Sequence, residues 1–150
     1  MPHTVITAIK KIDATSRLQL PITENGISAG FPSPADDFID LSIDLNKTFI
    51  QHPNATFFGR VSGDSMINAG LSDGDYLIID RSLEPKHKQI AVCLINGDFT
   101  VKRLHILKEN VYLVPENEAY QPIEVTPEDD FNIWGVVTTV IKPLQVSCLR

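Results

Sequence analysis

Ser65 and Lys102 are the two residues of this chain whose types and local settings could do chemistry together. Ser65 lies in the run Val-Ser-Gly-Asp-Ser-Met at 61–66, and Lys102 lies in Phe-Thr-Val-Lys-Arg-Leu at 99–104. A serine hydroxyl becomes a strong nucleophile when a neighbouring base takes its proton, and a neutral lysine amine can be that base. The pair would form a hydrolytic site that needs no histidine, metal or cofactor.

Lys102 can act as a base only where its surroundings disfavour the ammonium form. An ordinary lysine has a pKa near 10.4, so about one part in a few thousand is neutral at pH 7. A depression of roughly three units, worth about 4 kcal/mol, would make the amine a competent proton acceptor. On a strand, Lys102 would share a face with Thr100, Leu104 and Ile106. Apolar residues fall on both faces of this strand, so the alternation leaves the burial of Lys102 open.

Ser65 follows a glycine at a point where a strand should turn into a short helical segment. Backbone N–H groups are free at such a turn, and the amides near Asp64 and Ser65 could form an oxyanion hole. Taken alone, Gly-Asp-Ser is also an ordinary turn, and a single lysine on a strand is usually solvated. Each motif by itself is therefore compatible with a catalytic role and with an ordinary structural one.

Ala29 and Gly30 form a candidate substrate upstream of Ser65. Their small side chains would let a nucleophile approach the main chain, while Ile27 and Phe31 could anchor the flanks. The 35 positions between Gly30 and Ser65 could span over ~100 Å if extended, so reach is not limiting. If the segments meet, the protein cuts itself.

The elements that must position these residues are mainly β-strands. Residues 1 to about 30 show no sustained period and are predicted to be an arm outside the core. A short helix is expected near 44–50, with Asp44 as its N-cap. Asn96-Gly97 predicts a type I′ hairpin that holds Lys102 on its second strand. The expected strands are 56–62, 76–80, 89–95, 99–107, 111–115, 122–125 and 131–141.

Composition indicates one compact domain without an anionic partner. The 150 residues are 43% hydrophobic, which suffices for a core, and the net charge of −6 disfavours direct nucleic-acid binding. Cys93 and Cys148 lack a ligand pattern, so both are expected to be reduced thiols, and no metal or cofactor is expected. No run approaches the ~20 apolar residues of a membrane span, so no membrane association and a cytoplasmic location are predicted.

In combination, these motifs resemble the LexA/UmuD family of self-cleaving serine-lysine proteins from about Ile27 to Pro143. Ser65 lies 35 positions after Gly30, and Lys102 lies 37 after Ser65, which fits that family. The motifs that carry the resemblance are Ala29-Gly30 with Phe31-Pro32-Ser33-Pro34, Asp44-Leu45-Asn46, Gln51 to Thr56, Ser62 to Met66, Ser72 to Asp75, Phe99 to Leu104, and Gly135-Val136-Val137.

The resemblance implies a fold, a domain division and a reaction. The fold would be a compact, curled antiparallel β-domain of the LexA/UmuD C-terminal type, with one short helix and a flexible N-terminal arm. Residues 1–29 would be the cleavable arm and 30–150 the peptidase-like domain. Ser65 would attack the bond between Ala29 and Gly30, with Lys102 as the base.

The short arm is similar to that of UmuD-type members, because the 29 residues before Gly30 are too few for the helix-turn-helix domain of LexA-type repressors. That similarity implies an SOS-response accessory subunit that cleaves itself when RecA–single-stranded-DNA filaments form. The shortened homodimer would then join a Y-family polymerase subunit similar to UmuC in translesion synthesis. Longer segments at both ends distinguish this chain from the usual UmuD pattern.

Other function classes stay open at this point. One is a non-catalytic dimeric adaptor of the polymerase, and another is a LexA-like or phage-type regulator that lacks its DNA-binding domain. A signal-peptidase-like enzyme would use similar chemistry on other chains. A Ser-His triad is disfavoured, because Ile67 stands where the nucleophile elbow requires glycine and no histidine lies in a triad motif.

Overall fold

The chain is mainly β and divides into two compact units. The computed structural model describes residues 4–15, 19–23 and 39–144. One unit comprises Met1–Ile12 and Asn54–Arg150, and the other comprises Asp13–Pro53. The Ser65 and Lys102 segments both belong to the first unit, whereas Ala29 and Gly30 lie outside the described residues.

The unit of residues 13–53 contains a two-stranded antiparallel sheet followed by the predicted short helix. Strand β2 (Gln19–Thr23) pairs with β3 (Ile39–Asp44), and α1 (Leu45–Phe49) follows directly. The Asp44 carboxylate accepts hydrogen bonds from the first free amides of α1, which satisfies donors that a helix start leaves unpaired. The prediction of a helix capped by Asp44 is therefore confirmed. The 3₁₀ turn η2 (Pro53–Ala55) comes next along the chain.

An eight-stranded antiparallel sheet forms the other unit, in the order β1-β4-β5-β10-β6-β7-β8-β9. All seven strands expected from the sequence are present, with ends within one residue of those predicted, and the mainly β, curled antiparallel fold is confirmed. The strands are β1 (Val5–Lys11), β4 (Thr56–Ser62), β5 (Tyr76–Asp80), β6 (Ile90–Ile95), β7 (Asp98–Ile106), β8 (Val111–Val114), β9 (Ile123–Val125) and β10 (Phe131–Ile141).

The Asn96-Gly97 turn joins β6 to β7 and sets the register of the strand that carries Lys102. Asn96 has φ 50° and Gly97 has φ 88°, the left-handed pair that a type I′ turn requires. Across the hairpin, Lys102 lies opposite Ala91 and Val101 lies opposite Val92. The predicted hairpin is confirmed.

Apolar side chains cover both faces of this hairpin. One cluster includes Val61, Met66, Leu77, Ile79, Val92 and Val101, and another includes Ala91, Cys93, Leu104 and Leu113. Val101 and Leu104 therefore belong to different clusters although they lie on the same strand. Lys102, on the same strand, has no exposed surface, and such burial disfavours the charged form of an amine.

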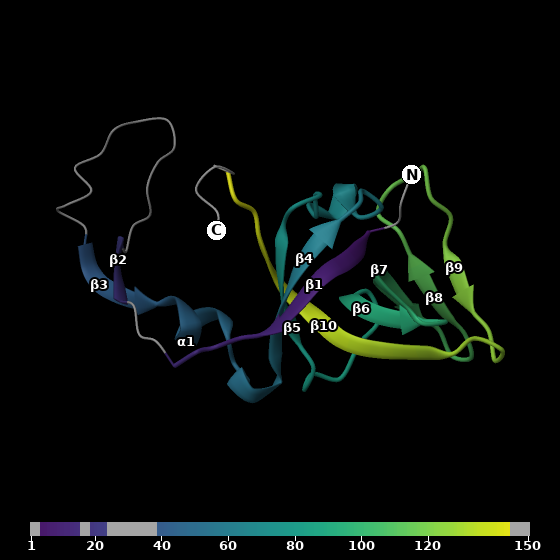
Figure 1. Ribbon diagram of the computed structural model, residues 1–150, viewed down its shortest axis with the longest axis horizontal. Coiled ribbons are helices and arrows are strands. Elements are labelled where there is room, and N and C mark those ends of the chain that lie inside the picture. The colour runs from purple at the N-terminus through teal and green to yellow at the C-terminus, as the bar shows by residue number, and fades with distance from the viewer. Residues whose placement is uncertain (1–3, 16–18, 24–38, 145–150) are drawn as a thin grey trace. The chain divides into compact units, whose positions relative to one another are not determined.

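The N-terminal strand β1 is the main departure from the sequence-based fold. The sequence predicted an arm outside the core, yet β1 pairs antiparallel with β4, from Val5 opposite Ser62 to Lys11 opposite Phe57 (Figure 1). The register shifts between Ile6 and Ala8, so inward and outward positions do not alternate regularly. This bulge removed the period-two pattern from which a strand is recognised.

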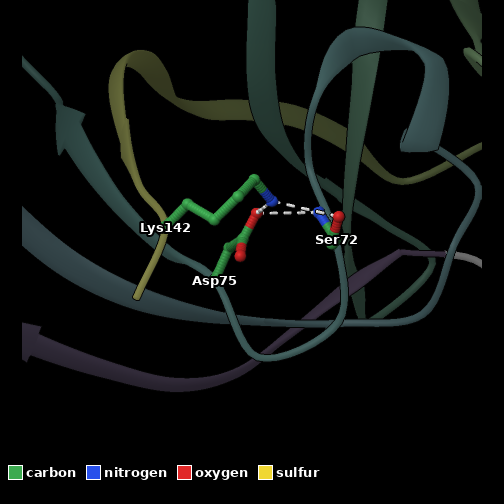
Figure 2. Close-up of polar contacts among 3 residues, drawn as sticks. All are labelled: Ser72, Asp75 and Lys142. Carbon is green, nitrogen blue, oxygen red and sulfur yellow. Dashed lines mark hydrogen bonds and ion pairs between the residues drawn. The ribbon is translucent and has the colours of Figure 1, made fainter. Parts of the chain in front are cut away.

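A buried carboxylate fastens the turn before β5 to the end of β10. The Asp75 side chain is 4% exposed and accepts hydrogen bonds from the Ser72 amide at 2.8 Å and from Lys142 Nζ at 2.5 Å (Figure 2). Lys142 Nζ also donates to Ser72 Oγ at 3.0 Å. This ion pair links two segments that are about 70 residues apart in the sequence.

Candidate serine-lysine site

The structure brings Ser65 and Lys102 into direct contact. Lys102 Nζ lies 3.0 Å from Ser65 Oγ, and neither residue has any solvent-exposed surface. Lys102 comes from the middle of β7, and Ser65 comes from the turn after β4. The burial of Lys102, which strand alternation left open, is therefore complete.

The turn that carries Ser65 is held at its start by a glycine. Gly63 has φ 98°, a conformation that side chains other than glycine rarely adopt, and its amide donates to Asp73 Oδ1 at 3.0 Å. After Ser65 the chain enters the 3₁₀ turn η3 (Ile67–Ala69), as the sequence indicated. The Gly-Asp-Ser run is thus a turn whose geometry ends β4 and presents the serine hydroxyl to β7.

The loop that follows β8 forms hydrogen bonds with this turn and stabilises it. The Asn117 side-chain amide donates to the Asp64 carbonyl at 3.0 Å, and the Tyr120 hydroxyl donates to Asp64 Oδ1 at 2.5 Å. The Glu116 amide donates to the Ser65 carbonyl at 2.8 Å. These contacts leave no local pattern in the sequence, because they join segments some 50 positions apart.

The Lys102 amine has three hydrogen-bond partners, which fit an ammonium with three N–H donors as well as a neutral amine that accepts the serine proton. Nζ lies 2.8 Å from Thr100 Oγ1 and 3.1 Å from the Val101 carbonyl. Thr100 Oγ1 donates its own proton to the Thr4 carbonyl at 3.2 Å, so both of these groups accept from Nζ. A neutral amine has two N–H donors and one lone pair, and the lone pair then faces the Ser65 O–H.

Burial lowers the pKa of Lys102 to about 8. The nearest opposing influence is a charged Cys93 thiolate, but burial raises the pKa of Cys93 to about 12, so this thiol is neutral at physiological pH. With a pKa of about 8, roughly one Lys102 amine in ten is neutral at pH 7, against about one in three thousand for an ordinary lysine. Burial therefore moves the Lys102 amine toward the neutral form that a general base requires.

A second serine-lysine contact in the described part of the chain shows what distinguishes this pair. Lys142 Nζ lies 3.0 Å from Ser72 Oγ, but the Asp75 carboxylate binds the same amine and Lys142 is 42% exposed (Figure 2). Lys102 has no carboxylate among its described hydrogen-bond partners and no exposed surface, so its burial is not offset by a paired anion.

The amides of Asp64 and Ser65 are oriented by the clamped turn but have no hydrogen-bond acceptor among the described residues. They remain the predicted oxyanion hole. The next amide, that of Met66, donates to Thr4 Oγ1 at 3.2 Å.

Thr4, near the N-terminus, contacts the Ser65 side chain directly. Its amide donates to Ser65 Oγ at 2.8 Å, and its side chain is buried. The predicted substrate, Ala29-Gly30, lies outside the described residues. Nothing in the sequence indicated that a residue so close to the N-terminus reaches the serine.

Within the described ranges, no group of three or more His, Cys, Asp or Glu side chains could hold a metal ion. No helix in the same ranges is long and apolar enough to span a bilayer.

Comparison with known protein families matches residues 21–138 to Peptidase S24-like. The match covers most of the chain and both segments of the site. The chain therefore belongs to the Peptidase S24-like family.

Within that family the chain is UmuD-like, as its motifs predicted. It is 42% identical to protein MucA of Salmonella typhimurium over 132 residues, which are 87% of this chain and 89% of MucA. It is 44% identical to protein ImpA of Shigella flexneri over 121 residues, which are 81% of this chain and 82% of ImpA. It is also 37% identical to the LexA repressor of Stenotrophomonas maltophilia over 126 residues, 84% of this chain and 59% of the repressor.

Proposed function

We propose that this chain is a self-cleaving serine peptidase that cuts its own Ala29–Gly30 bond, with Ser65 as nucleophile and Lys102 as general base. The observation that supports this proposal most strongly is the fully buried Lys102 amine, 3.0 Å from the serine oxygen and without a carboxylate among its described hydrogen-bond partners. Membership of a peptidase family supports the same reaction class.

The reaction begins when neutral Lys102 takes the Ser65 proton and Oγ attacks the Ala29 carbonyl carbon. The oxyanion that forms is stabilised by the amides of Asp64 and Ser65. Lys102, now an ammonium, protonates the Gly30 nitrogen as the C–N bond breaks, and residues 1–29 remain esterified to Ser65. Lys102 then removes a proton from water, which hydrolyses the ester and restores the serine.

A hollow next to the site is lined in part by Val5 and Ile6 of β1. Its volume is about 750 Å³, and it lies beside Thr100, whose hydroxyl contacts the Lys102 amine. Apolar side chains such as those of Phe99 and Ile123 contribute to its walls. Because Val5 and Ile6 belong to its walls, this hollow is a feature of the chain with β1 in place.

The similarity to UmuD-like proteins supports a role in the SOS response. In this role, a RecA–single-stranded-DNA filament would stimulate cleavage in the cytoplasm, and residues 30–150 would form a homodimer. The dimer would serve a Y-family polymerase subunit of the UmuC type in error-prone lesion bypass. The acidic chain, with a net charge of −6, suits an accessory subunit that binds protein rather than DNA.

Mass measurement of the purified chain after incubation at mildly alkaline pH tests the cleavage. We expect a product that begins at Gly30, and we expect no product from Ser65→Ala or Lys102→Ala. Ser62→Ala is the matched control, because it removes a hydroxyl from the same run of sequence and should leave cleavage unchanged.

Unchanged mass in the unmodified chain, with and without RecA filaments, would refute self-cleavage and favour the non-catalytic dimeric adaptor. Repeated turnover of an added peptide would instead indicate an enzyme that acts on other chains.

A further inference from the structure

Thr4 forms hydrogen bonds with Ser65 and with residues next to Ser65 and Lys102. Its amide donates to Ser65 Oγ at 2.8 Å, and its hydroxyl accepts from the Met66 amide at 3.2 Å. Its carbonyl accepts from the Val101 amide at 3.1 Å and from Thr100 Oγ1 at 3.2 Å. One residue thus satisfies groups on both walls of the site, with no exposed surface of its own.

The strand that follows Thr4 holds it in place. Strand β1 runs beside β4 along its whole length (Figure 1). Ile6 is partly buried and packs against the apolar cluster that includes Val61 and Met66. Its side chain lies against Gly59, where an added methyl group would come within 3.3 Å of two Ile6 atoms. Both backbone pairing and apolar packing therefore stabilise this position.

A scissile bond cannot react while Thr4 is in place. Reacting atoms must approach to about 3–3.5 Å, and the space next to Ser65 Oγ is taken by the Thr4 amide. Ser65 also has no exposed surface through which a second segment could reach it.

We propose that β1 is an intramolecular inhibitor, an N-terminal strand that must leave the serine-lysine site before the Ala29–Gly30 segment can bind. This inference rests on the proposed self-cleavage and adds its regulation. The observed rate is then the intrinsic rate multiplied by the fraction of molecules in which β1 is detached. An activator could accelerate cleavage by binding the detached state, without touching the catalytic groups.

A reversible cross-link tests the proposal. Ala8 of β1 lies opposite Arg60 of β4, and neither side chain contributes to the catalytic groups. In the double variant Ala8→Cys/Arg60→Cys, a disulfide should slow self-cleavage at least tenfold, and a reductant should restore it. Each single variant, treated with the same oxidant, is the control and should cleave at the unmodified rate.

Cleavage of the cross-linked chain at the unmodified rate, with the disulfide verified by mass, would overturn the inference while leaving self-cleavage intact. Failure of the unmodified chain to cleave would instead refute the proposed function, so the two failures are distinguishable.

A charge on the inward face of β1 should have the opposite effect to the cross-link, because it should detach β1 and accelerate cleavage. Ile6→Asp should weaken docking and raise the cleavage rate about tenfold or more, provided that its thermal unfolding remains cooperative. Ala8→Asp adds the same charge at an exposed position of β1 opposite Arg60 and should change the rate little. A rate for Ile6→Asp equal to that of Ala8→Asp would contradict inhibition by β1. Loss of residues 1–3 alone would also overturn it, because Thr4 would then be part of a substrate.

Discussion

The lowered pKa of Lys102 predicts a specific pH profile for self-cleavage. Only the neutral amine can take the Ser65 proton, so the rate follows the neutral fraction of Lys102. With a pKa of about 8, that fraction is about one-tenth at pH 7 and about nine-tenths at pH 9. The rate should therefore rise about tenfold from pH 7 to pH 9 and change little from pH 9 to pH 10.

The assay is the first-order loss of intact chain, followed by mass spectrometry in buffers of constant ionic strength. Lys102→Arg should abolish cleavage at every pH, because a guanidinium keeps its proton throughout this range. A rate that still increases about sevenfold between pH 9 and pH 10 would show an ordinary lysine and would refute the argument from burial.

The same shift predicts a change in stability that does not depend on catalysis. Between pH 7 and pH 9 the folded chain releases the Lys102 proton while the unfolded chain keeps it, so the free energy of unfolding rises with pH. A shift to about 8 corresponds to a rise of about 1.4 kcal/mol over this interval. Urea unfolding of Ser65→Ala should show this rise, whereas Ser65→Ala/Lys102→Met should lack it. Equal pH dependence in the two variants would contradict the prediction.

Three further substitutions test how the site and its scaffold are built. Thr100→Val removes the hydroxyl that contacts the Lys102 amine and should slow self-cleavage about tenfold, while Thr100→Ser should retain most of the rate. Lys142→Met leaves the buried Asp75 carboxylate without its cation and should lower the free energy of unfolding by about 1–2 kcal/mol, measured with urea; no change would show that the Ser72 amide suffices. Gly135→Ala places a methyl group 2.6 Å from the Ile79 side chain and should cost about 1–3 kcal/mol in the same assay; an unchanged midpoint would contradict close packing there.

Local patterns were sufficient for the elements that carry the two site residues. The Asn96-Gly97 turn and the alternation around it predicted the β6–β7 hairpin, and Asp44 marked the helix start. Such signals depend on neighbours within a few positions, so they can be read without knowledge of the fold. They placed Lys102 on a strand and Ser65 at a strand end, as the structure shows.

The burial of Lys102 could not be read from its strand. Both Val101 and Lys102 are fully buried, because β7 is covered on both faces, and a strand buried on both faces has no informative alternation. Burial of a lysine between apolar layers depends on strands far away in the sequence. The sequence signal that linked Lys102 to Ser65 was their spacing of 37 positions, which resembles that of the LexA/UmuD family.

The contacts of Thr4 and Asn117 with the Ser65 turn could not be predicted, because they join residues far apart in the sequence. Thr4 and Ser65 are 61 positions apart, and Asn117 and Asp64 are 53 apart. No periodicity or turn rule links such pairs. The bulge in β1 also removed the alternation that would have indicated this strand.

Capture of the acyl-enzyme is the measurement that tests the central claim most directly. Self-cleavage by Ser65 passes through an ester between this serine and Ala29, which a strong nucleophile such as hydroxylamine can intercept before water does. Incubation at pH 9 with hydroxylamine should release residues 1–29 with a hydroxamate at Ala29, and Ser65→Ala should release nothing. A released arm that carries only a carboxylate, in equal amount from Ser65→Ala, would contradict a serine nucleophile.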